Sequence, residues 1–186
     1  MQPEESLLAE WVAQARAGDS TAFAKIVETF ERPLYRYLVR VTGDAALAQD
    51  LFQETFLKVH LGLPGYEPRG RLKAWVYSIA THLASDARRS AARRREDLDP
   101  AGLAAASVTR SDPADDPGGV AALAGAVGEL PEEERAVVCL HAYGGLTFRE
   151  IAHVLGAPLG TVLYWMHRAT RRLRDALAHR RGEEGP

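Results

Sequence analysis

The sequence predicts an all-α protein in which two small helical domains are joined by a flexible acidic linker. Apolar residues recur at helical spacing along most of the chain, and no segment shows sustained apolar/polar alternation with β-branched enrichment. A stretch rich in Pro, Gly, Ser and Asp interrupts this pattern. The 186 residues are enough for two domains that each bury a modest core. We expect domains at 1–95 and 120–181, a linker at 96–119 and a tail at 182–186.

Four helices are expected in the first half of the chain. A short amphipathic helix ends at Gly18, and Asp19 is a suitable N-cap for a second helix. Pro33 is expected to kink or break that second helix, because its ring clashes with the preceding turn. Gly43 ends it, and Asp44 caps a third helix that reaches about residue 61. After a loop rich in Gly and Pro, a fourth helix runs from residue 71 into the basic stretch RRSAARRR.

The second half predicts a helix-turn-helix. A weak Ala-rich helix over 120–127 precedes a helix opened by Pro131, whose first turn holds three acids that the helix dipole favours. Thr147 and Glu150 form a capping box at the start of a short helix that ends at Gly156. The last helix begins near Gly160. A short capped helix, a tight turn and a longer basic helix are typical of DNA-binding helix-turn-helix units.

Charge is distributed unevenly along the chain. The net charge of −2 would alone argue against nucleic acid, because phosphate binding needs a positive field. However, residues 58–95 carry nine Lys or Arg and two acids, and residues 163–181 carry six Arg and one acid. Between them, residues 96–117 carry six acids and one Arg. Two basic regions separated by an acidic spacer favour a two-point nucleic-acid binder, with ordinary solvated helix faces as the alternative.

The sequence argues against an enzyme, a metal site and a membrane protein. Cys139 is the single cysteine and, with His141 and His153, lacks the paired spacing of a zinc site, so we expect a buried thiol. No nucleophile, base and orienting group converge, and no Gly-rich phosphate loop follows a strand. No run of eighteen apolar residues occurs, and the N-terminus is acidic. We expect a cytoplasmic protein without cofactor or membrane insertion.

The expected third helix has one mixed face. Asp50, Gln53, Glu54 and Leu57 share this face, opposite the side that we expect to be buried. A few acids around an apolar anchor are common in protein-binding surfaces. The alternative is a surface helix with one stray leucine, because scattered exposed apolar residues are normal.

The expected fourth helix carries cations, an aromatic ring and hydroxyl groups on one stripe. Its members, at spacings of three and four, are Arg71, Trp75, Ser78, His82, Ser85 and Arg89. Cations can hold a single-stranded backbone while an aromatic ring stacks against a base. Trp75 could equally lie at the edge of the core.

On the last helix, the predicted buried seam and the outer face separate clearly. The seam consists of Val162, Met166, Ala169, Leu173 and Ala176. The outer face consists of Tyr164, His167, Arg168 and Arg171. We expect Trp165 to pack against the preceding helix and Tyr164 to point towards the major groove, where it could touch a thymine methyl or donate its hydroxyl.

Three stretches together resemble bacterial extracytoplasmic-function (ECF) sigma factors of the sigma-70 family. DLFQETFLKV at 50–59 looks like the segment that grips RNA polymerase, and KAWVYSIATHLASDARR at 73–89 looks like the segment that melts and reads the downstream promoter element. Residues 130–174 resemble the helix-turn-helix that reads the upstream element. The chain departs from the family pattern at His82, where Asn is usual, and at Leu163, where Lys or Arg is common.

The resemblance implies three sets of contact residues. Core polymerase contacts are expected at Asp50, Gln53, Glu54 and Leu57. Downstream promoter contacts are expected at Arg71, Lys73, Trp75, Ser78, His82, Ser85, Arg88 and Arg89. Upstream promoter contacts are expected at Arg149, Thr161, Tyr164, His167, Arg168, Arg171, Arg172 and Arg174.

The predicted function is therefore that of an initiation factor without catalytic activity of its own. It would bind core RNA polymerase, recognise duplex and melted promoter DNA, and be held inactive by an anti-sigma factor. The alternatives are an autonomous helix-turn-helix regulator and a sigma-like chain retained only as an interaction protein. The Trp75 stripe and the Asp50 face argue against the autonomous regulator, which needs neither. We expect the acidic linker to be a tether that could also repel template phosphates or mimic nucleic acid inside the polymerase.

Overall fold

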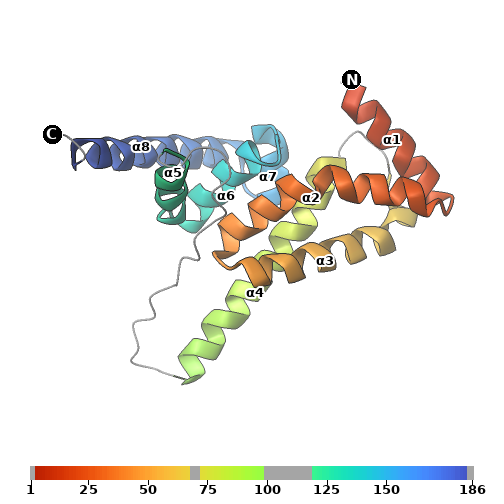
Figure 1. The fold of residues 1–186 in the computed structure, drawn as a ribbon, viewed down its shortest axis with the longest axis horizontal. Coiled ribbons are helices and arrows are strands. Elements are labelled where there is room, and N and C mark those ends of the chain that lie inside the picture. Colours follow the sequence, from red (N-terminus) through yellow and green to blue (C-terminus); the bar gives the residue numbers. More distant parts are fainter. Residues whose placement is uncertain (1–2, 68–71, 99–118, 184–186) are drawn as a thin grey trace.

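The computed structural model describes residues 3–67, 72–98 and 119–183, and every regular element in these ranges is helical (Figure 1). This confirms the predicted all-α class. The first half contains α1 (Pro3–Arg16), α2 (Ser20–Thr42), α3 (Ala45–Gly62), the 3₁₀ turn η1 (Leu63–Gly65) and α4 (Leu72–Leu98). The second half contains α5 (Gly119–Gly128), α6 (Glu132–Ala142), α7 (Phe148–Leu155) and α8 (Leu159–Glu183).

Helix α2 is the centre of the first half, where it contacts α1, α3 and α4. Its buried stripe includes Ile26, Leu34 and Leu38, each fully removed from solvent. Val59 of α3 and Val76 of α4 are also fully buried. Burying each such aliphatic side chain contributes about 1.5–3 kcal/mol, so this shared core fixes which faces of α3 and α4 remain outside.

The predicted helix ends of α2 and α3 are confirmed. Asp19 accepts hydrogen bonds from the amides of Thr21 (2.8 Å) and Ala22 (3.2 Å), and Asp44 caps α3 in the same way. Gly43 closes α2 with φ +72°, in the left-handed region that an L side chain rarely adopts. These capping groups are strictly local, which explains why the sequence alone located them.

Of the two effects expected at Pro33, a kink or a break, the break does not occur, because α2 continues from Ser20 to Thr42 without interruption. A proline inside a helix costs about 3 kcal/mol. The flanking residues Phe30, Leu34 and Leu38 are all buried against the core. Since each buried side chain contributes about 1.5–3 kcal/mol, this packing outweighs the cost of the proline.

The second half contains the predicted helix-turn-helix in α7 and α8. The capping box is confirmed, because Thr147 N donates to Glu150 Oε2 at 2.8 Å and Glu150 N donates to Thr147 Oγ1 at 3.4 Å. Gly156 ends α7 with φ +61°. Pro158 then accepts from the amides of Thr161 and Val162, which starts α8. Helix α6 packs against both α7 and α8.

The two halves pack against each other along α2, α4 and the first helices of the second half. Helix α4 contacts α7, and α2 contacts α5 and α6. Across this boundary, Arg40 Nε donates to Tyr143 Oη at 3.4 Å and Arg88 forms an ion pair with Glu132. The buried residues of both halves form one continuous apolar cluster.

Two helices are longer than the sequence predicted. Helix α4 continues to Leu98, so residues 96–98 of the expected linker are helical, and α8 continues to Glu183. The sequence RRREDL consists largely of good helix formers, and no Gly or Pro stops it. Gly119, the last expected linker residue, is the first residue of α5. Positions 99–118, which carry the remaining linker expectations, lie outside the described residues.

Candidate protein-binding and nucleic-acid surfaces

The mixed face of α3 is exposed as predicted. Asp50, Gln53 and Glu54 are all exposed, and 58% of Leu57 is accessible to solvent. The sequence analysis missed Leu61, which is 70% exposed and lies one turn after Leu57 on the same stripe. The four-residue spacing of the two leucines was the available signal. We call Asp50, Gln53, Glu54, Leu57 and Leu61 the α3 surface.

Helix α4 places Trp75 at the edge of the core. The half-buried indole stacks on Tyr66, with ring centroids 4.6 Å apart and planes at 26°. A Cβ added at Gly62 would lie 3.0 Å from Trp75 Cζ2, so the end of α3 approaches the ring closely. Arg71 falls outside the described residues. The ring of Trp75 therefore packs against Tyr66, which lies in the segment before α4, and the ring remains partly accessible to solvent.

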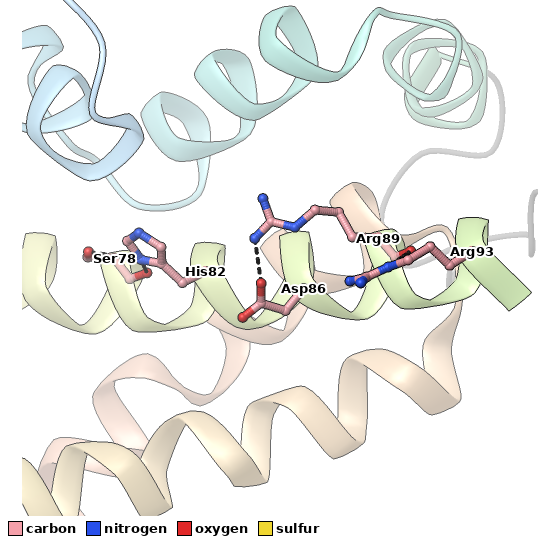
Figure 2. A network of polar contacts seen from close by, with 5 residues as sticks. All are labelled: Ser78, His82, Asp86, Arg89 and Arg93. Carbon is pink, nitrogen blue, oxygen red and sulfur yellow. Dashed lines mark hydrogen bonds and ion pairs between the residues drawn. The ribbon is translucent and has the colours of Figure 1, made fainter.

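Further along α4, polar side chains form two separate groups of local contacts (Figure 2). His82 Nδ1 donates to the backbone oxygen of Ser78 at 2.6 Å, and Arg89 pairs with Asp86. This hydrogen bond from Arg89 lowers the pKa of the exposed Asp86 carboxyl. Arg93 Nε in turn donates to the backbone oxygen of Arg89 at 3.4 Å. Asp86, which the sequence analysis did not include in the stripe, reduces the positive charge available from Arg89.

Three other expected downstream residues are only partly accessible to solvent. Lys73 and Ser85 are half-buried. Arg88 is half-buried too, and it extends towards the second half to pair with Glu132. The stripe therefore presents His82 and Arg89 to solvent, whereas Arg88 faces another part of the same chain.

The predicted division of α8 into a seam and an outer face is confirmed. Within the seam, Val162 and Ala169 are fully buried and the other three members are partly buried. Trp165 is half-buried against the apolar cluster. Thr161 is half-buried at the start of the helix. The remaining expected upstream contacts are exposed, namely Arg149, Tyr164, His167, Arg168, Arg171, Arg172 and Arg174.

A buried carboxylate that the sequence analysis missed organises this outer face. Only 6% of the Glu134 side chain is exposed, and its oxygens lie 3.4 Å from Arg168 Nε and 3.1 Å from Arg172 Nε. Arg168 also donates from Nη1 to Tyr164 Oη at 3.0 Å, which raises the pKa of the guanidinium. Glu134 belongs to α6, and no local pattern links it to arginines more than thirty positions away. Two of the expected phosphate contacts therefore share one buried negative charge.

The thiol of Cys139 is buried, as predicted. Burial raises its pKa to about 12, so the thiol stays protonated at neutral pH. The neighbouring His141 is committed to other contacts, because it bonds to Leu146 O at 3.0 Å and stacks on Phe148. Over the described ranges, no group of three or more His, Cys, Asp or Glu could hold a metal ion, and no helix is long and apolar enough to cross a membrane.

Comparison with known protein families gives two matches in chain order. Residues 26–94 match sigma-70 region 2, and residues 121–173 match sigma-70 region 4. The first range contains the α3 surface and the described part of the α4 stripe, and the second contains α7 and most of α8. Together the two matches cover more than half of the chain.

Individual relatives agree with these family matches. The ECF RNA polymerase sigma factor SigE of Mycolicibacterium smegmatis is 34% identical over 178 residues, and the alignment covers 89% of this chain and 66% of SigE. For SigW of Bacillus subtilis the identity is 27% over 186 residues, with 93% of this chain and 98% of SigW covered. The fold is similar to that of the sigma factor RpoE from Bartonella quintana, whose structure was solved in complex with the anti-sigma factor NepR. The TM-score is 0.73 and the sequence identity is 20%, and the match covers 84% of this chain and 96% of RpoE. The order of the two regions, the helical architecture and these relatives together place the chain in the sigma-70 family, as an ECF sigma factor.

Proposed function

We propose that this sigma factor binds core RNA polymerase through the α3 surface, opens and reads the downstream promoter element through α4, and reads the upstream element through α8. It supplies binding and positioning, and the polymerase supplies the chemistry. Each surface lies on a different helix, and the shared core holds all three helices. The chain can therefore connect polymerase and promoter without a catalytic group of its own.

The observation that carries this proposal is the α3 surface. Leu57 and Leu61 are 58% and 70% exposed on consecutive turns, next to the carboxylates of Asp50 and Glu54. Two adjacent exposed leucines with acids beside them fit a protein interface with an apolar anchor and a polar rim. An autonomous DNA-binding regulator has no use for two adjacent exposed leucines on this helix. The Asp50 carboxylate beside them would repel phosphates, whereas Glu54 is paired with Lys58 at 3.6 Å.

On α4, the Trp75 ring and the cations have complementary roles in our proposal. Trp75 provides a supported aromatic face on which an unstacked base can stack, and such stacking contributes about 1–3 kcal/mol per base. Arg89 lies further along the same helix, and Lys73 lies two residues before Trp75; both would attract the backbone phosphates. Stacking of an extruded base would stabilise the open strand relative to the duplex.

We also propose that an anti-sigma factor regulates this chain. The structurally similar RpoE was solved in complex with the anti-sigma factor NepR. An exposed acidic and apolar α3 surface, together with cationic stripes on α4 and α8, gives such a partner both apolar and charged groups to cover.

A titration of core polymerase against variants of α3 tests the proposal. Asp50→Arg is expected to raise the dissociation constant about tenfold or more, because reversing an interface charge places like charges together. The exposed Glu31 of α2 provides a matched control, and Glu31→Arg should leave the affinity unchanged. Both variants should keep their unfolding free energy within about 0.5 kcal/mol of the parent.

The two possible failures differ. Unchanged affinity for Asp50→Arg would reject the α3 surface as the contact. Absence of core binding by the parent chain would reject polymerase binding altogether and favour the autonomous regulator.

A further inference from the structure

The start of α8 presents an apolar and aromatic tip to solvent. Leu159, Leu163 and Tyr164 are 36%, 46% and 55% exposed, and they precede the arginines of the same helix. In the proposed promoter complex this end of α8 meets the base edges, because the N-terminal residues of a recognition helix enter the major groove. The most exposed side chains at this end of α8 therefore offer the Tyr164 hydroxyl and much apolar surface.

The Tyr164 side chain is held in place by Arg168, which is itself paired with the buried carboxylate of Glu134. Arg168 Nη1 donates to Tyr164 Oη at 3.0 Å, and the guanidinium carbon lies 5.7 Å from the centroid of the phenol ring. Arg168 Nε lies 3.4 Å from Oε1 of Glu134, whose side chain is 6% exposed on α6. An exposed ring is thus tied, through one arginine, to a carboxylate fixed in a different helix.

The contact with Arg168 determines whether the Tyr164 hydroxyl can donate or accept a hydrogen bond on its outer side. The phenol oxygen accepts the hydrogen bond from Arg168, so the hydroxyl hydrogen is directed to another partner. A hydroxyl oriented in this way acts outward as a donor. Fixing the orientation in advance also reduces the entropy that the side chain would lose on binding.

The donor role restricts the bases that Tyr164 can recognise. In the major groove, guanine, adenine and thymine each present an acceptor, whereas the cytosine edge presents only its amino donor. Among the three, thymine also carries a methyl group, which an exposed aliphatic side chain such as Leu163 contacts favourably. We propose that Tyr164 and Leu163 read a thymine in the upstream element, and that Arg168 acts as a positioning residue for Tyr164. This inference rests on the proposed binding of promoter DNA by α8.

The charges on α8 support separate roles for its arginines. Arg168 and Arg172 share the buried carboxylate of Glu134. In the part of the chain that the structure describes, Arg171 and Arg174 form no ion pair and are exposed. Among the arginines of α8 whose side chains the structure describes, Arg171 and Arg174 are therefore the main source of phosphate attraction, and they position the helix without specifying sequence.

A binding selection on randomised upstream duplexes tests the proposal, with the full chain assembled on core polymerase. The parent should select thymine at one position, and Tyr164→Phe should lower that preference about 5- to 150-fold, the range of a single base-pair mismatch. Arg168→Met should lower the same preference while leaving the salt dependence of binding nearly unchanged. The matched control is Arg174→Met, which should keep the preference and lower the salt slope by about one unit.

Modified bases at the selected position separate the two contacts. Uracil lacks the methyl group, so it should weaken binding by the parent but not by Leu163→Ala. 5-Methylcytosine keeps the methyl group and replaces the acceptor with an amino donor. It should weaken binding by the parent and have much less effect on Tyr164→Phe.

The outcomes distinguish this inference from the function on which it rests. If the parent assembly selects an upstream element and Tyr164→Phe selects the same bases, promoter binding stands and thymine reading by Tyr164 is rejected. If Arg168→Met lowers the salt slope by about one unit and keeps the thymine preference, Arg168 is a phosphate contact and not a positioning residue. If the parent assembly selects no element, the proposed function itself fails.

Discussion

Two buried tyrosines differ in how their hydroxyl groups are satisfied. Tyr37 Oη lies 2.7 Å from Thr81 Oγ1, and this hydrogen bond connects α2 to α4. Tyr77 Oη is buried and has no hydrogen-bond partner among the described residues. Burial raises the pKa of both phenols, so both groups stay protonated well above neutral pH. The same residue type thus contributes a bond at one site and an uncompensated polar group at the other.

Substitution of each tyrosine by phenylalanine should therefore have opposite effects. Tyr77→Phe is expected to raise the free energy of unfolding by about 1 kcal/mol, because an unsatisfied buried hydroxyl costs about 1–3 kcal/mol. Tyr37→Phe, the matched control, is expected to lower it by about 1 kcal/mol through loss of the hydrogen bond to Thr81. Urea denaturation of the three proteins measures both changes. A loss of stability in Tyr77→Phe would show that its hydroxyl is satisfied in solution.

At the residue scale, exposure was predictable from the sequence and pairing across helices was not. The helical wheel correctly placed Tyr164 and Arg168 outside and Val162 inside, because it depends only on the period of one helix. It could not show that Glu134 is buried beneath Arg168, since the two residues lie on different helices. Glu132, Glu133 and Glu134 at the start of α6 look equivalent in the sequence, and only the tertiary packing shows that Glu134 is the buried one.

At the scale of single elements, the starts of the capped helices followed local chemistry closely, whereas the ends of α4 and α8 did not. Asp19, Asp44 and Thr147 cap their helices as predicted, because capping uses atoms within three residues of the cap. The absence of the expected break at Pro33 has the opposite origin. The continuity of α2 depends on core contacts with other helices, and these outweigh a local preference that the sequence shows clearly.

Trp75 of α4 has a structural contact, the stack on Tyr66, and a proposed role in strand opening, and the two can be separated. Trp75→Ala removes the stack on Tyr66 as well as the aromatic face that we propose for a base. We expect this variant to lose more transcription from duplex promoters than from promoters already mismatched over the melted region, because only the duplex requires strand opening. Trp75→Phe keeps an aromatic ring and should retain most of the activity on both templates.

Run-off transcription on the two templates, with unfolding free energies measured in parallel, checks this prediction. An equal loss of activity on both templates would assign Trp75 to the core edge alone.

At the scale of the whole molecule, the two halves pack together in the described structure (Figure 1). Gly144 contributes to this contact, because a Cβ at this position would lie 3.2 Å from Cζ of Tyr77 in the first half. The sequence predicted two domains and gave no indication of their contact. Such packing joins residues that are distant along the chain, and neither periodicity nor capping motifs report on it.

The ion pair between Arg88 and Glu132 should contribute modestly to this packing. It is partly exposed, and exposed pairs contribute about 0–1 kcal/mol. Glu132→Arg places two cations together and should increase the population of separated halves by up to about fivefold. The double variant Arg88→Glu/Glu132→Arg restores opposite charges and should restore the parent distribution.

Energy transfer between dyes attached to α1 and α8 measures this distribution. Cys139 need not be removed for such labelling, because its thiol is buried and its pKa is raised to about 12. Equal transfer in all three proteins would show that the pair does not contribute to the packing of the halves.

The central claim is that one chain joins core polymerase to two promoter elements, and initiation itself tests it most directly. Core polymerase is incubated with genomic fragments of the source bacterium, with and without the protein, and the 5′ ends of the transcripts are sequenced. We predict discrete start sites that depend on the protein, share two upstream sequence elements and are lost with Asp50→Arg. Protein that binds duplex DNA yet produces no start sites with core polymerase would contradict the account.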